Sequence, residues 1–116
     1  MKKKILIAML LMTLIVGCNP GVSPKSCVVV KAEGCLWDDL LELGHVVGYV
    51  NNQCAQKLRY VKIQATGYSS TKMLLDRDSE IVFDIYPKQN GYFDALLHPS
   101  IGVVTNCTVE VLEAEY

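Results

Sequence analysis

The chain has 116 residues, of which 51% are hydrophobic and 20% charged, and its formal net charge is −1. This length suits one domain, and so apolar a composition excludes a disordered tail. The nearly balanced charge excludes a strongly basic nucleic-acid-binding protein, so we expect no nucleic acid among its partners.

The beginning of the chain has the pattern of a secretion signal. Lysines occupy positions 2–4, and residues 5–16 are apolar except for Thr13. A helix over this apolar run is about 18 Å long, well short of the hydrocarbon core of a bilayer, which is about 30 Å thick. The run is therefore predicted to be the apolar core of a signal peptide rather than a stable membrane span.

The four residues that end this run, Ile15-Val16-Gly17-Cys18, resemble the lipobox of bacterial lipoproteins. The resemblance implies that residues 1–17 are a signal peptide and that Cys18 becomes the first mature residue, acylated on sulfur and anchoring the protein to a membrane. Asn19 differs from the Asp of the enterobacterial inner-membrane retention signal. In a Gram-negative host the expected location is therefore the outer membrane, facing the periplasm. An ordinary secretory signal with a chance cysteine is the alternative.

Cleavage changes the charge of the remaining chain. Eight basic residues then face twelve acidic ones, a formal net charge of −4, so the mature body is not expected to adhere to anionic lipid by charge. Residues 18–26, with two prolines and a glycine, are predicted to form a lipidated tether, and residues 27–116 the folded domain.

Four later segments alternate apolar and polar residues, which is typical of strands with one buried and one exposed face. They cover residues 58–66, 80–86, 92–97 and 103–113. On their buried faces we expect Val61, Ile63 and Ala65, then Ile81, Phe83 and Ile85, then Phe93, Ala95 and Leu97, and finally Val103, Cys107, Val109 and Val111.

Two less regular strands are predicted at residues 27–31 and 45–51, and residues 37–43 fit either a single helical turn or an extra strand. Turn-forming residues separate these segments, for example at residues 76–79. Such a succession of short strands predicts an all-β fold, an immunoglobulin-like β-sandwich of about seven antiparallel strands.

Once Cys18 is set aside, four cysteines remain, Cys27, Cys35, Cys54 and Cys107. In an oxidising compartment they can form two disulfides, although four reduced buried thiols are the alternative. In an immunoglobulin-like order, the loop after the second strand and the loop before the last strand lie at the same end. This favours a pairing of Cys54 with Cys107, and of Cys27 with Cys35.

The stretch from Gly44 to Asn52, Gly-His-Val-Val-Gly-Tyr-Val-Asn-Asn, resembles the opening Val-x-Gly-x-Val-x-Asn strand of the FxLYD domain. That family is an immunoglobulin-like module of bacterial and archaeal envelope lipoproteins. The spacing to residues 58–66 and 91–93 is also similar, whereas the Phe-x-Leu-Tyr-Asp signature itself is matched only by Tyr68. Because the family shares no enzymatic activity, the resemblance implies no catalytic residue.

Motifs of catalysis and of metal binding are absent from the sequence. It contains no Gly-x-Ser-x-Gly elbow, no phosphate-binding loop and no Cys-x-x-Cys pair. His45 and His98 are far apart, and residues 76–80 lack the glycine and the final glutamate of a calcium-binding EF-hand loop. We therefore expect no catalysis, no cofactor and no metal site.

Three tyrosines on outward-facing positions, Tyr60, Tyr86 and Tyr92, are a candidate binding face, because tyrosine is common at protein interfaces. Strands also favour tyrosine for their own packing, which is the alternative explanation. The expected function is that of a protein-binding or accessory module with an envelope protein as partner. The alternatives are an inhibitor or immunity lipoprotein that blocks an enzyme, toxin or phage, and a small hydrolase.

Overall fold

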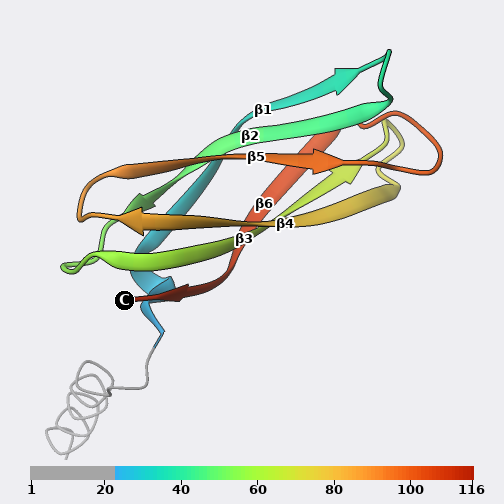
Figure 1. The fold of residues 1–116 in the computed structure, drawn as a ribbon. Helices are drawn as coiled ribbons and strands as arrows, with labels where there is room; N and C mark the ends of the chain where they lie inside the picture. The colour runs from blue at the N-terminus through green and yellow to red at the C-terminus, as the bar shows by residue number, and fades with distance from the viewer. Residues whose placement is uncertain (1–22) are drawn as a thin grey trace, which may run out of the picture.

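A computed structural model describes residues 23–116, which fold into two three-stranded antiparallel sheets packed face to face (Figure 1). The first sheet has the order β1 (Val28–Asp38), β2 (Leu43–Asn52) and β5 (Asn90–Leu97). The second has the order β4 (Leu74–Ile85), β3 (Leu58–Tyr68) and β6 (Asn106–Glu115). The predicted β-sandwich is confirmed, with six strands where about seven were expected.

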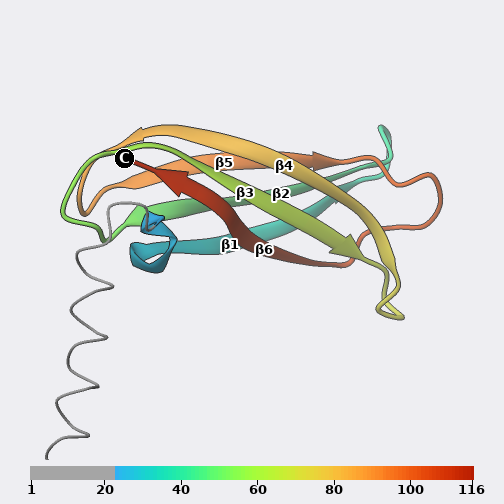
Figure 2. The same cartoon turned by 90° about the horizontal axis from the view of Figure 1, so that it is seen from below.

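Successive strands run in alternating directions, so the sandwich has two distinct ends (Figure 2). We call the base the end that holds Ser23, the connections 53–57 and 86–89 and the C-terminal Tyr116. We call the tip the opposite end, formed by the turns 39–42 and 69–73 and the loop 98–105. At the base, the hydroxyl of Ser23 donates to the backbone oxygen of Ala114 (3.3 Å), which brings both ends of the described chain together.

The domain begins slightly earlier than the sequence predicted. A short 3-10 helix, η1 (Pro24–Cys27), is capped by the hydroxyl of Ser23, and Pro24 is buried. Residues 23–26, which we expected to end a free tether, are therefore packed on the base. The predicted signal peptide, the lipidation site Cys18 and the rest of the predicted tether lie outside the described residues. Within residues 23–116 no helix is long and apolar enough to span a bilayer.

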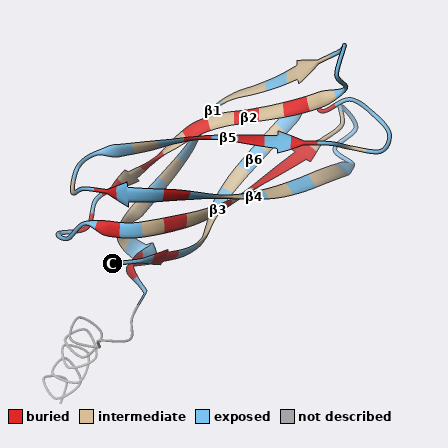
Figure 3. Ribbon diagram, in the orientation of Figure 1, coloured by how far each residue is buried: buried red, intermediate tan, exposed pale blue. Residues whose placement is uncertain are grey.

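The core is formed by apolar side chains from the inner faces of both sheets (Figure 3). The predicted inward residues of β3 and β5 are confirmed as buried, namely Val61, Ile63, Ala65, Phe93, Ala95 and Leu97.

Along β4 the predicted alternation is wrong at two positions. Ile81 and Phe83 are 46% and 63% exposed, and Val82 is buried in their place. The periodicity is interrupted at Asp84, whose φ of 53° lies in the left-handed region, so Ile85 returns to the core three residues after Val82. A strict period of two therefore assigned the first half of this segment to the wrong face.

The first strand is longer than predicted. β1 continues through a bulge at Glu33, where its register against β2 shifts, and ends only at Asp38. One carboxylate oxygen of Asp38 then accepts hydrogen bonds from the backbone N–H groups of Leu40 (2.9 Å) and Leu41 (3.1 Å). Residues 37–43 are thus neither a helical turn nor a separate strand, but the end of β1, a tight turn and the start of β2.

The predicted turn at residues 76–79 is also wrong, because these residues belong to β4 and pair with β3. The last strand begins later than expected, at Asn106, since residues 98–105 form the loop that crosses from one sheet to the other.

The four cysteines form two disulfides, and the predicted pairing is wrong. Cys27 is joined to Cys54 and Cys35 to Cys107, with Cα–Cα separations of 5.0 Å and 5.8 Å. Cys54 follows β2 and lies at the base, whereas Cys107 opens β6 close to the tip, so the strand directions keep these two apart. Because β1 runs from base to tip, Cys27 at its start meets Cys54, and Cys35 near its far end meets Cys107.

Candidate binding surface

The three connections of the tip carry large apolar side chains that remain exposed. Their exposed fractions range from 44% to 93%, and the three connections lie at the same end of the sandwich. The residues concerned are Leu40, Leu41, Met73, Leu74, Ile101 and Val103.

Hydrogen bonds within the two hairpin turns hold these side chains in place. Asp38 caps the turn that carries Leu40, as described above. In the other hairpin, the hydroxyl of Ser69 accepts from the backbone N–H groups of Thr71 (3.2 Å) and Met73 (3.1 Å). Turns that are ordered before binding lose less conformational entropy when a partner docks.

The loop 98–105 is fixed by one buried side chain. Val104 is only 3% exposed, and it packs where Gly44 of one sheet and Gly67 of the other leave room. A Cβ at Gly67 would lie 3.0 Å from Val104 and 2.6 Å from Leu97, so glycine is needed there for close packing. The N–H of His98 also donates to Asp76 (2.7 Å), which attaches the start of the loop to β4.

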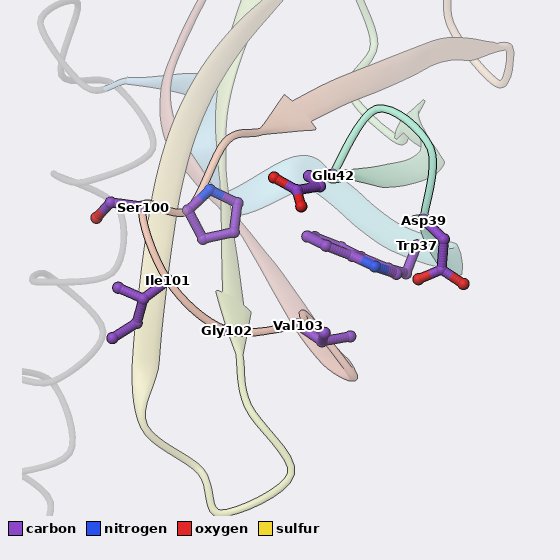
Figure 4. A pocket seen from close by; sticks show the side chains of 8 residues that line it. Trp37, Asp39, Glu42, Ser100, Ile101, Gly102 and Val103 are labelled. Carbon is purple, nitrogen blue, oxygen red and sulfur yellow. The ribbon is translucent and has the colours of Figure 1, made fainter.

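A cleft of about 320 Å³ opens at the tip between the β1–β2 turn and this loop (Figure 4). Trp37, Asp39 and Glu42 line one side, and residues 99–103 line the other. In the view of Figure 4 the Glu42 carboxylate lies near the end of the Trp37 indole that faces the loop, and Asp39 lies at the other end of the indole. The lining holds two carboxylates and no basic residue, so it is chemically suited to a cation.

The three tyrosines of the predicted binding face do not share one surface. Tyr60 lies on β3 and donates to Glu113 (2.8 Å), a bond that raises the pKa of its phenol. Tyr92 lies on β5, in the opposite sheet, where it makes an edge-to-face contact with Tyr49 at 6.1 Å between ring centres. Outward positions on the two sheets of a sandwich face opposite sides, so Tyr60 and Tyr92 do not form one face. Tyr86 follows β4 and lies at the base.

Although far apart in sequence, the two histidines lie toward the same end of the first sheet, because His45 is paired with Leu96, two residues before His98. His45 on β2 pairs with Asp94 on β5 (3.0 Å between Nδ1 and Oδ1), whereas His98 lies in the tip loop. In the part of the chain that the structure describes, no group of three or more His, Cys, Asp or Glu side chains could hold a metal ion.

One carboxyl group is perturbed by its surroundings. Glu80 is partly buried on β4, and this burial, followed by the hydrogen bond and charge of Asp78 and the charge of Asp94, raises its pKa. Burial and like charge act in the same direction here because both disfavour the ionised form.

The tip was missed by reasoning from the sequence. The sequence predicts a single helical turn or an extra strand for residues 37–43, which hold Trp37, Leu40 and Leu41, and it predicts no binding role for Ile101. The available signal was the presence of large apolar residues inside segments rich in turn-forming and acidic residues, where burial is not expected.

Comparison with known proteins supports the fold. No family model and no curated protein matches the sequence. Among solved structures, the chain is similar to a DUF1425 family member from Shewanella sp. PV-4, with a TM-score of 0.56 and 15% identity over 77% of this chain and 80% of that one. It is also similar to IrmA from Escherichia coli, with a TM-score of 0.48 and 9% identity over 75% and 74% of the two chains. The resemblance to FxLYD domains stays a prediction.

Proposed function

We propose that this protein is a lipid-anchored lipoprotein of the cell envelope that binds a protein partner through its tip. The observation that carries the proposal is the placement of the exposed apolar turns at the end opposite Ser23. The proposed anchor, Cys18, comes five residues before Ser23 in the sequence, and Ser23 lies at the base. Strands of 10 to 12 residues then hold the tip about 35 Å further from the membrane.

The proposed role is binding without catalysis, as an accessory module that needs no cofactor. Exposed apolar side chains on ordered turns, next to a cleft, have the character of an interface core rather than of a reaction site. In a Gram-negative host we propose that the protein faces the periplasm from the outer membrane.

The loop 98–105 also supports the second candidate function, an inhibitor or immunity lipoprotein. This loop projects Ile101 from the tip, where it is 66% exposed. Such a residue could enter the active site of a cognate enzyme or toxin. Both functions use the same surface, and the identity of the captured partner distinguishes them.

The anchor is tested by mass spectrometry of the protein purified from cells. We expect loss of residues 1–17 and an added diacylglyceryl mass on Cys18. Substitution Cys18→Ser should release the protein from the membrane fraction. An unmodified Cys18, or membrane association unchanged by the substitution, would contradict lipid anchoring.

The tip is tested by photo-crosslinking in intact cells, with a photoreactive residue placed at Leu40 or, as a control, at the exposed Lys88 of the base. We expect a discrete adduct from the Leu40 position only, lost when Ile101→Ser removes an exposed apolar side chain of the tip loop. Equal adducts from both positions, or none from Leu40, would refute a binding tip. If purified adducts contain an enzyme that this protein inhibits, the second candidate is correct.

A further inference from the structure

We propose that the cleft beside Trp37 receives an arginine side chain of the partner protein. This inference rests on the proposed function and specifies the chemistry of its binding surface.

The shape of the cleft suits one long side chain. Its volume of about 320 Å³ is at the lower end of the range of small-ligand pockets, and its walls are the indole of Trp37 and the loop from Pro99 to Val103. Ile101 and Val103 of the loop belong to the lining and add apolar surface to the cleft.

The charge of the cleft selects a cation. Neither Asp39 nor Glu42 forms an ion pair with any residue of the described chain, whose salt bridges all lie elsewhere. A cation above an indole ring gains attraction from the π-system, and a carboxylate beside it adds a charge-assisted hydrogen bond. Arginine fits both features better than lysine, because its planar guanidinium stacks on aromatic rings and pairs with carboxylates through two parallel bonds.

The backbone of Glu42 allows a substitution that removes the carboxylate without straining the turn. Its φ of 54° lies in the left-handed region, where glycine or asparagine is favoured and other residues cost roughly 1 kcal/mol. The turn would be more stable with asparagine at this position.

A lipid surface is the competing occupant of an apolar tip. The β1–β2 turn, however, carries three acidic residues, Asp38, Asp39 and Glu42, which anionic headgroups would repel. The charges therefore favour a basic protein surface over a membrane.

The test uses the intrinsic fluorescence of Trp37, which is the only tryptophan of the chain and so reports on the cleft alone. Protein purified from cells in mild detergent is titrated with the peptide acetyl-Gly-Arg-Gly-amide, and with the same peptide carrying citrulline, the uncharged isostere of arginine. We expect saturable changes in emission for the arginine peptide, and an affinity about tenfold lower for the citrulline peptide.

Variants separate binding from folding. Glu42→Asn should weaken binding of the arginine peptide about tenfold, while the melting temperature stays equal or rises because asparagine tolerates the left-handed backbone. The matched control Glu110→Gln, which removes an exposed carboxylate of β6, should leave binding unchanged.

Three outcomes would overturn the inference: equal affinity for both peptides, full binding by Glu42→Asn, or a shift of Trp37 emission with phosphatidylcholine vesicles but not with the arginine peptide. The last outcome assigns the tip to a lipid surface. If Leu40 crosslinks a partner in cells but the peptide does not bind, the inference fails and the proposed function stands. If Leu40 crosslinks nothing, both fail.

Discussion

Asn52 is the buried polar residue around which the base is organised. Its amide group donates to the backbone oxygens of Gln56 (2.9 Å) and Ile85 (2.8 Å), and its side-chain oxygen accepts from the N–H of Cys54 (2.7 Å). One fully buried side chain thus joins the end of β2, the following connection and the end of β4.

Substitution Asn52→Ala should lower the free energy of unfolding by about 2 to 3 kcal/mol, because it leaves buried backbone groups without partners. Chemical denaturation of the purified protein measures this. The neighbouring Asn51→Ala, which removes a half-exposed amide bonded to Asn90, is the control and should cost less than about 1 kcal/mol. Equal losses from the two substitutions would contradict the structural role of Asn52.

Glu80 makes stability depend on pH. Its pKa in the folded protein is raised above the ordinary value of 4.5, so the folded state holds the proton more tightly than the unfolded chain. The resulting contribution to stability is fully present below pH 4.5 and is lost as the pH rises through the higher, folded-state pKa.

The inward-facing charge protects β4, an edge strand, from pairing with another sheet.

Glu80→Gln should therefore stabilise the protein at pH 7, by less than about 1 kcal/mol since the group is partly solvated, and should have little effect below pH 4.5. Thermal melts of both proteins across this pH range provide the measurement, with Glu110→Gln as the exposed control. If Glu80→Gln stabilised the protein more at acidic pH than at pH 7, the prediction would be contradicted.

At the scale of elements, the two disulfides fix both ends of β1, one to the connection between β2 and β3 and the other to β6. The sequence separations of 27 and 72 residues correspond to stabilisation by about 3.5 and about 4.4 kcal/mol in the loop-entropy model. Cys35–Cys107 links the edge strands β1 and β6 of different sheets, so it closes one side of the sandwich.

Nonreducing peptide mapping should join the peptide of Cys27 to that of Cys54, and the peptide of Cys35 to that of Cys107. Replacing both Cys35 and Cys107 with serine should lower the free energy of unfolding by about 4 kcal/mol, less any strain that is released. A peptide that joins Cys54 to Cys107 would show that the strand directions described above are incorrect.

The strands with regular alternation, β3 and β5, could be predicted closely from the sequence, because each buries one face and exposes the other. β1 could not, since the bulge at Glu33 interrupts its period and hides the continuity from Val28 to Asp38. The disulfide error followed from that failure, because only a β1 that reaches Cys35 brings this residue to the start of β6. The cleft depends on which turns share an end, and local patterns do not contain that information.

On the scale of the whole molecule, the two ends of the sandwich are held together in different ways. The base gathers Ser23, the C-terminal residues and the Cys27–Cys54 bridge, and it is the end from which the proposed tether leaves. The tip carries no disulfide in its turns, and its order comes from side-chain hydrogen bonds and from Val104. Sequence changes in the turns can thus alter the surface of the tip without disturbing the base.

The Cys27–Cys54 bridge has a mechanical consequence for the anchored protein proposed above. Tension between a membrane and a partner held at the tip enters the domain at Cys27. Without the bridge this tension would act on β1 alone. β1 is an edge strand, and within its sheet it is hydrogen-bonded only to β2. Cys54 lies between β2 and β3, the central strands of the two sheets, so the covalent link passes the force directly to both. In a protein anchored and bound as proposed, the bridge would keep β1 from being peeled away from β2.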